Sequence, residues 1–270
     1  MTARVNDIDY LDHLERESAR FAAAVRATTS DADVPTCPEW TADDLLWHLA
    51  EVQWNWGTIV RERITETADA NALEAPSRPD DRAGLLAFYD RVSADLGIAL
   101  AAAPPETTVW TWADEQTAGF IRRRQAHEAL IHRIDAELAA GEPTPMDPAL
   151  SLDGVEEILR IMYGGAPPWG EFTPHPADTI RVRATDTGTT WLLTLGRFVG
   201  TNPDDGNAID ESDLRVAATD PGGPAAAELA GSAADLDLWL WHRPTVGEVE
   251  RSGDEKVLAA FDAAIAPGIN

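Results

Sequence analysis

Residues 122–137 read RRRQAHEALIHRIDAE and carry the side chains that are best suited to bind a metal ion. In a helix, Glu128 and His132 lie one turn apart and about 40° around the axis from each other. A carboxylate and an imidazole at this spacing can bind the same cation. His48, on the apolar face of another predicted helix, is the candidate third ligand. The sequence therefore predicts a divalent-metal site made by His48, Glu128 and His132.

Two imidazoles and one carboxylate form a common ligand set for zinc, and they leave a fourth coordination position open. The same set also suits ferrous iron or nickel. A thiol at the open position would lose its proton readily, whereas a bound water would become a hydroxide for hydrolysis. The ligand types alone therefore leave four alternatives open: thiol chemistry, hydrolysis, oxygen chemistry on iron, and a non-catalytic metal- or small-ligand-binding protein.

Arg124 and Asp135 continue the helical face of the candidate ligands. Arg124, one turn before Glu128, is the expected partner of that carboxylate or of a bound anion. Asp135, one turn beyond His132, can accept a hydrogen bond from the second ring nitrogen. His127 lies about 140° around the helix from His132, so the two histidines do not form the H-E-x-x-H motif of zinc proteases. We expect His127 to flank the site without binding the metal.

Four amphipathic helices are predicted to position these residues, because apolar residues recur at helical spacing between Pro, Gly and cap residues. Thr41 and Asp44 form the pattern of a capping box. The predicted helices cover residues 7–28, 42–65, a segment that starts at Pro79 and ends before Pro104, and 115–139. Residues 30–40 are expected to form a loop. Modest connections favour an antiparallel four-helix bundle as the first domain, residues 1–145.

The pattern changes in residues 146–270, where short alternating segments appear. A helix is predicted at 149–163, strands at 179–186, 190–196, 213–219 and 226–231, and helices at 233–242 and 254–264. Residues 200–212 are expected to form an exposed loop. Strands followed by helices favour a small α+β domain.

Composition excludes several classes of partner. The net charge of −26 and the pI of about 4.4 give a surface that repels nucleic acid. There is a single cysteine, Cys37, and no long apolar run, so we expect neither an internal disulfide nor a membrane span. The first thirty residues lack the apolar core of a signal peptide. We therefore expect a cytoplasmic monomer or homodimer, and its arginine-rich basic residues are typical of a GC-rich genome.

Three segments together resemble one known family. VPTCPEWTADDLLWHLAEV (residues 34–52) is similar to the second-helix region of the mycothiol-dependent maleylpyruvate isomerase family, and RRRQAHEALIHRIDAE is similar to its fourth-helix signature. LDGVEEIL (152–159) resembles the start of its second domain. The resemblance spans nearly the whole chain. Glu39 departs from it, since the family often has glycine there.

The resemblance implies a fold, a cofactor and a reaction for an actinobacterial protein. The fold is a DinB-like four-helix bundle followed by a small α+β domain similar to sterol carrier proteins. The metal ligands correspond to His48, Glu128 and His132. In the named enzyme, zinc activates mycothiol, and the thiolate adds to a cis double bond of a small electrophile. Rotation and elimination then give the trans isomer. An arginine of the second domain takes part, and Arg243 is its match here. Arg243 and Arg124, which was chosen from its helical position, are the candidate catalytic residues.

Overall fold

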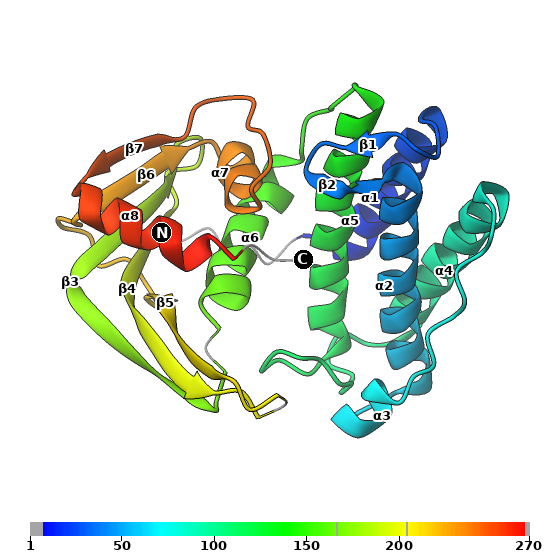
Figure 1. Ribbon diagram of the computed structural model, residues 1–270, viewed down its shortest axis with the longest axis horizontal. Coiled ribbons are helices and arrows are strands. Elements are labelled where there is room, and N and C mark those ends of the chain that lie inside the picture. The colour runs from blue at the N-terminus through cyan, green and yellow to red at the C-terminus, as the bar shows by residue number, and fades with distance from the viewer. Residues whose placement is uncertain (1–7, 166, 204, 268–270) are drawn as a thin grey trace. The chain divides into compact units, whose positions relative to one another are not determined.

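Four long helices form the N-terminal part of the chain. The computed structural model describes residues 8–165, 167–203 and 205–267, which divide into two compact units, Met1–Met146 and Asp147–Asn270. The helices of the first unit are α1 (Tyr10–Ala27), α2 (Ala42–Glu62), α4 (Arg82–Ala102) and α5 (Ala118–Ala140), with the short α3 (Thr67–Asn71) between α2 and α4 (Figure 1). All four long predicted helices are present. The predicted first residue of α1, residue 7, lies outside the described residues.

Local sequence signals set the ends of the helices that carry the candidate ligands. At the start of α2, Thr41 Oγ1 accepts a hydrogen bond from Asp44 N, and the Asp44 carboxylate accepts one from Thr41 N, as the capping pattern predicts. Thr117 caps α5 by accepting a hydrogen bond from Phe120 N on its Oγ1, and Gly141 ends this helix with φ of 76°. Arg63 ends α2 with φ of 55°, a left-handed conformation that is uncommon for a residue with a side chain.

The helix directions differ from the expected antiparallel bundle. Asp43 is ion-paired with Arg82 at the first turns of α2 and α4, and farther along Gly57 packs against Leu96, so these two neighbours run parallel. α1 and α5 are parallel neighbours too, because Arg20 near the end of α1 pairs with Glu137 near the end of α5. The connection between α2 and α4, which contains α3, is long enough to return the chain to its starting end, and this permits the parallel arrangement.

The segment between α1 and α2 was expected to be a loop, and this was wrong. It forms a two-stranded antiparallel sheet of β1 (Asp33–Val34) and β2 (Cys37–Thr41). Val34 is fully buried against the bundle and is what anchors the hairpin. The two strands were not predicted, because the segment contains two prolines and proline lowers the strand propensity of so short a segment.

Buried ion pairs join α1 to α5 in addition to the apolar core. The guanidinium of Arg133 is fully buried; its Nε donates to Glu17 at 2.8 Å and its Nη1 donates to Glu137 at 2.9 Å. Arg133 Nη1 also donates to the carbonyl oxygen of Thr144 at 3.0 Å. Glu17 is fully buried as well. This network fixes the end of α5 against α1 and against the segment that leads out of the first unit.

The C-terminal unit is an α+β fold built on a mixed sheet. Its strands are β3 (Gly170–Ala184), β4 (Thr190–Thr201), β5 (Ala208–Val216), β6 (Ala227–Gly231) and β7 (Glu250–Gly253). The strand order is β5-β4-β3-β6-β7, with β3 and β6 parallel and the other pairs antiparallel. The helices are α6 (Pro148–Glu157), continued by the π-helix η1 (Ile158–Tyr163), then α7 (Ala233–Leu240) and α8 (Glu255–Ile265).

The predicted α+β class is confirmed, and several predicted bounds are wrong. β3 and β4 extend well beyond the predicted hairpin segments, and their register shifts between Pro174 and Thr179. The expected loop at 200–212 instead contributes the end of β4 and the start of β5. This part of the sheet and β7 were not predicted, because polar residues interrupt the alternation that marks a strand. None of the helices in the described part of the chain is both long enough and apolar enough to cross a membrane.

Candidate metal centre

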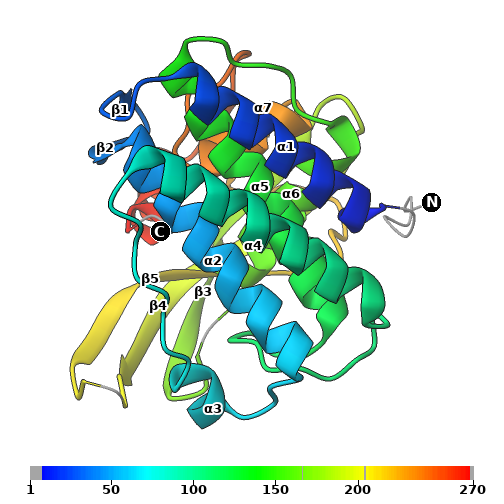
Figure 2. The same cartoon turned by 90° about the vertical axis from the view of Figure 1, so that its right-hand side faces the viewer.

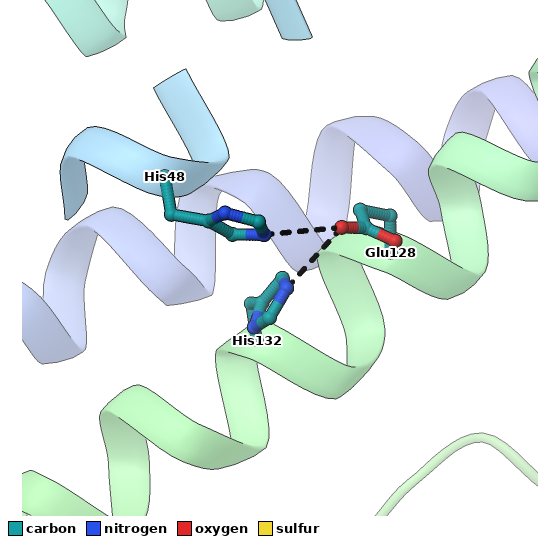
Figure 3. A group of neighbouring side chains, drawn as sticks. All are labelled: His48, Glu128 and His132. Carbon is teal, nitrogen blue, oxygen red and sulfur yellow. Dashed lines mark hydrogen bonds and ion pairs between the residues drawn. The ribbon is translucent and has the colours of Figure 1, made fainter. Parts of the chain in front are cut away.

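Two antiparallel helices of the first unit bring three candidate ligands together. Glu128 and His132 project from successive turns of α5, and His48 projects toward them from α2 (Figure 3). One nitrogen from each imidazole and one carboxylate oxygen all lie within 4.8 Å of one another. The side chains are partly shielded, with 26% of His48, 17% of Glu128 and 11% of His132 exposed. A small ligand from solvent can therefore still reach the group.

The interatomic distances fit a tetrahedral cation. Glu128 Oε1 lies 3.2 Å from His132 Nε2 and 3.6 Å from His48 Nε2. Ligand atoms at about 2.0–2.1 Å from a tetrahedral zinc are separated by roughly 3.3 Å from each other. The two imidazole rings meet edge to face, at an interplanar angle of 77° and with centroids 4.8 Å apart. The donor types and these two distances thus suit a divalent metal, and the two imidazole nitrogens lie within 4.8 Å of each other.

The outer nitrogen of His132 is held by a carboxylate. His132 Nδ1 lies 3.0 Å from Asp135 Oδ2, and Asp135 Oδ1 accepts a hydrogen bond from Thr36 Oγ1 at 2.6 Å. With its proton on Nδ1, the ring would donate to Asp135 and present Nε2 to a cation beside Glu128, which is how metal-binding histidines are usually oriented. The role predicted for Asp135 therefore agrees with its position. Thr36 was missed because its segment was expected to be a loop.

Arg124 pairs with the carboxylate of the site. Its Nη2 donates to Glu128 Oε2 at 3.0 Å, and its side chain is only 3% exposed. Burial would by itself raise the pKa of Glu128, but hydrogen bonds from His132 and His48 and the charges of His132 and Arg124 hold it well below its usual value. Burial would lower the pKa of His132, but Asp135 and Glu128 raise it to about 9. The site therefore keeps an ionised carboxylate and attracts positive charge.

We expect Asp135→Asn to weaken metal binding by about 10–100-fold, because the amide no longer fixes the His132 ring in the metal-binding orientation. Competition with a chelating dye measures this affinity. Asp90→Asn is the matched control, since Asp90 pairs with Arg26 on the surface of α4 and makes no contact with the site. Equal affinities for Asp135→Asn and the wild type would contradict the orienting role.

Two tryptophans of the α2 region and His127 lie in different surroundings. The ring centroid of Trp40 is 4.8 Å from that of His48, so Trp40 packs beside the site, whereas Trp47 packs against Phe88 in the core. His127 is buried and meets the ring of Tyr10 edge to face. This agrees with its expected flanking position.

Arg243 belongs to the C-terminal unit, just beyond α7. Its backbone nitrogen donates to Leu238 at 2.8 Å, and its Nη1 donates to the carbonyl oxygen of Trp241 at 2.6 Å. The preceding His242 has φ of 58°, and its ring contacts the carbonyl oxygen of Ile265 at 3.0 Å. The helix end is thus well anchored around Arg243. Of the five candidate site residues, the structure brings together the four of the first unit.

Two family models match the chain. The model of the mycothiol maleylpyruvate isomerase N-terminal domain matches residues 11–137, and the model of the MDMPI C-terminal domain matches residues 149–260. No curated protein matches the chain closely enough to count as a relative.

Two solved structures share the fold. The crystal structure of the mycothiol-dependent maleylpyruvate isomerase superposes with a TM-score of 0.59 at 12% identity, over 94% of this chain and 97% of that chain. The crystal structure of a histidine-to-alanine mutant of the mycothiol-dependent maleylpyruvate isomerase gives a TM-score of 0.58 at 13% identity, with the same coverage. At these identities the likeness defines the fold.

Fold and site together define a two-part protein in which a helical bundle with a candidate metal centre precedes an α+β unit. Since family models match both parts, the chain belongs to the mycothiol-dependent maleylpyruvate isomerase family. The family resemblance read from the sequence is confirmed. The prediction of an enzyme is confirmed at the level of the family, which is one of isomerases.

Proposed function

We propose that the protein is a divalent-metal enzyme that uses a small thiol to act on a small electrophile. Zinc is the proposed metal and mycothiol the proposed thiol, and the reaction is isomerisation or thiol transfer. The observation that carries the proposal is the convergence of His48, Glu128 and His132 at ligand spacing, with His132 oriented by Asp135. Family membership supports the choice of thiol. We further propose that the enzyme acts in the cytoplasm of an actinobacterium.

The three donors leave room for one further ligand. A divalent cation held by two neutral imidazoles and one carboxylate would lower the pKa of a thiol from about 8.5, so that the thiolate is available at neutral pH. Arg124 would keep Glu128 ionised and aligned through their 3.0 Å ion pair. Asp135 would hold the proton on His132 Nδ1, so that Nε2 faces the cation.

Mycothiol, if bound at the open position, would supply a thiolate nucleophile able to add reversibly to a polarised cis double bond, so that isomerisation to the trans product would consume no thiol. In thiol transfer the sulfur would stay on the substrate, and the neighbouring carbon would take up a proton.

Arg243 is proposed to bind the anionic group of the substrate. A net charge of −26 disfavours the approach of an anion, so a local guanidinium is needed to capture one. A guanidinium binds a carboxylate through two parallel hydrogen bonds, which also fixes its orientation.

The test of this function is the absorption spectrum of cobalt-substituted protein titrated with mycothiol. We expect an intense sulfur-to-cobalt charge-transfer band in the near ultraviolet, because the proposed site places the sulfur on the ion. Glutathione serves as the control thiol, and the Glu128→Gln variant as the control protein. A spectrum that does not change with mycothiol would contradict thiol activation and favour the hydrolase or the non-catalytic metal-binding alternative.

A further inference from the structure

The exposed face of α4 carries an apolar ridge between two grooves. In the first unit, α4 lies between α1 and α2 (Figure 2). A groove of about 720 Å³ between α2 and α4, the basic groove, is lined among others by Trp54, Arg61, Arg63, Phe88, Arg91 and Ile98. A groove of about 880 Å³ between α1 and α4, the acidic groove, is lined among others by Asp9, Asp12, Glu15, Asp90, Gly97 and Ile98. Ile98 separates the two grooves and is 69% exposed.

The two grooves carry opposite charges. In each groove, some charged side chains have no oppositely charged partner among the described residues. Among the residues that the structure describes, Arg63 and Arg91 have no carboxylate within ion-pair distance; the guanidinium of Arg91 lies over the ring of Phe88, 5.1 Å from its centroid. Across the ridge, Asp9 and Glu15 have no cationic partner in the same described ranges. Asp95 also lines the basic groove, and it leaves an excess of positive charge there. Such an excess is unusual in a chain of net charge −26.

Gly97 is a second feature that the folded chain does not itself require. It lies inside α4, where glycine costs about 1 kcal/mol relative to alanine. A Cβ built on Gly97 would meet nothing within 4 Å, so no neighbour within the chain demands its absence. With Ser93 and Ala101, it forms a strip of small side chains that lines the acidic groove. Such a strip lets another backbone come close.

We propose that this face binds a second copy of the chain, as a two-fold dimer whose axis runs roughly along α4. A two-fold axis in this direction places the basic groove of each copy over the acidic groove of the other, with the Ile98 ridges between them. An axis across α4 would instead face like grooves toward each other. The interface of a two-fold dimer must be self-complementary, and opposite charges on the two sides of one ridge meet this condition.

The charged residues also lie at matching levels along the axis. α1 runs antiparallel to α4, and Tyr89 Oη donates to Ser18 O. Ser18 therefore lies near the level of Tyr89. Glu15 precedes Ser18 by three residues, which places it about 4.5 Å farther toward the C-terminal end of α4, near the level of Arg91. A rotation about α4 preserves these levels, so Glu15 of one copy meets Arg91 of the other.

A second pair forms near the end of α4. Gly57 of α2 packs against Leu96, so Arg63 lies level with the last turn of α4. Asp9, at the start of α1, comes within about one helical turn of that level. Asp9 of one copy is therefore in reach of Arg63 of the other. Arg63 has a left-handed backbone conformation, with φ of 55°, and this sets the direction in which its side chain leaves the end of α2.

Charge reversal tests the dimer, with mass measured by sedimentation equilibrium on the full chain. We expect a dimer for the wild type. Glu15→Arg and Arg91→Glu should each raise the dissociation constant at least about tenfold, and the double variant should return it to within about threefold of the wild type. Glu74→Arg is the matched control, because Glu74 is exposed in the same unit and lines neither groove. It should leave the dissociation constant unchanged.

Gly97→Leu gives an independent measurement, because the added side chain would fill the proposed contact. We expect a monomer. Compared at a concentration where the wild type is also dissociated, its thermal unfolding temperature should not be below that of the wild type, since the Cβ position is open. Three results would overturn the proposal: a wild-type chain that is monomeric at every concentration, single reversals that leave the dimer intact, or a double variant that fails to restore it. The proposal is independent of the metal site, and the metal content of all variants should equal that of the wild type.

Discussion

His48→Ala protein, purified and then dialysed against zinc, is expected to contain no metal above the level of the dialysis buffer, while the wild type retains about one ion per chain. The variant keeps Glu128 and His132 but loses the one ligand that α2 contributes. Loss of an outer hydrogen-bond partner already costs about 10–100-fold in affinity, and loss of a ligand costs more. Metal analysis by plasma mass spectrometry on folded protein measures this directly.

His127→Ala is the control for that measurement, since it removes an imidazole from the same helix. His127 is buried and contacts Tyr10, on a different face of α5 from His132. We expect this variant to be less stable but to bind metal with the stoichiometry of the wild type per folded chain. Equal metal content in His48→Ala and the wild type would contradict the proposed ligand set.

The candidate ligands could be selected from the sequence because helical spacing is a strong constraint. Glu128 and His132 had to share a face of one helix, and the apolar stripe of α2 had to turn His48 toward the bundle. Asp135 followed from the same periodicity. Thr36 could not be found this way, because it contacts Asp135 from 99 positions away in the sequence. It also lies in a hairpin whose strands are too short and too rich in proline to be recognised from sequence.

The fold was predictable in its elements and less so in their arrangement. Amphipathic periodicity gives the existence of α2 and α4 but not their relative direction, which depends on how far the connection between them can reach. In the C-terminal unit, the outer parts of β3 and β5 carry few apolar side chains, so alternation does not mark them as strands. Pairing with the neighbouring strand, rather than local sequence, determines their length.

Arg133→Met is expected to lower the free energy of unfolding by about 3 kcal/mol, the lower end of the cost of breaking a buried ion pair, because Glu17 and Glu137 keep only the partly exposed Arg20 as a cationic partner, at 3.6 and 3.3 Å. Arg133 and Glu17 are both fully buried and 2.8 Å apart, and Glu137 is nearly buried at 2.9 Å. The sequence offered Arg133 only as part of the fourth-helix signature. The structure shows that it ties α5 to α1 and to Thr144. Urea denaturation followed by circular dichroism measures the loss.

Two further variants separate the cost of an unpaired buried charge from the loss of a favourable contact. Arg16→Met removes an exposed i,i+4 pair with Asp12 and should cost at most about 0.5 kcal/mol. The double variant Glu17→Leu/Arg133→Met removes both members of the closest buried pair. It should recover a large part of the lost stability, because Glu137 keeps its hydrogen bonds from Thr144 N and Oγ1. Additive losses in the double variant would mean that the ion pair itself, rather than the desolvation of an unpaired carboxylate, supplies the stability at this end of the bundle.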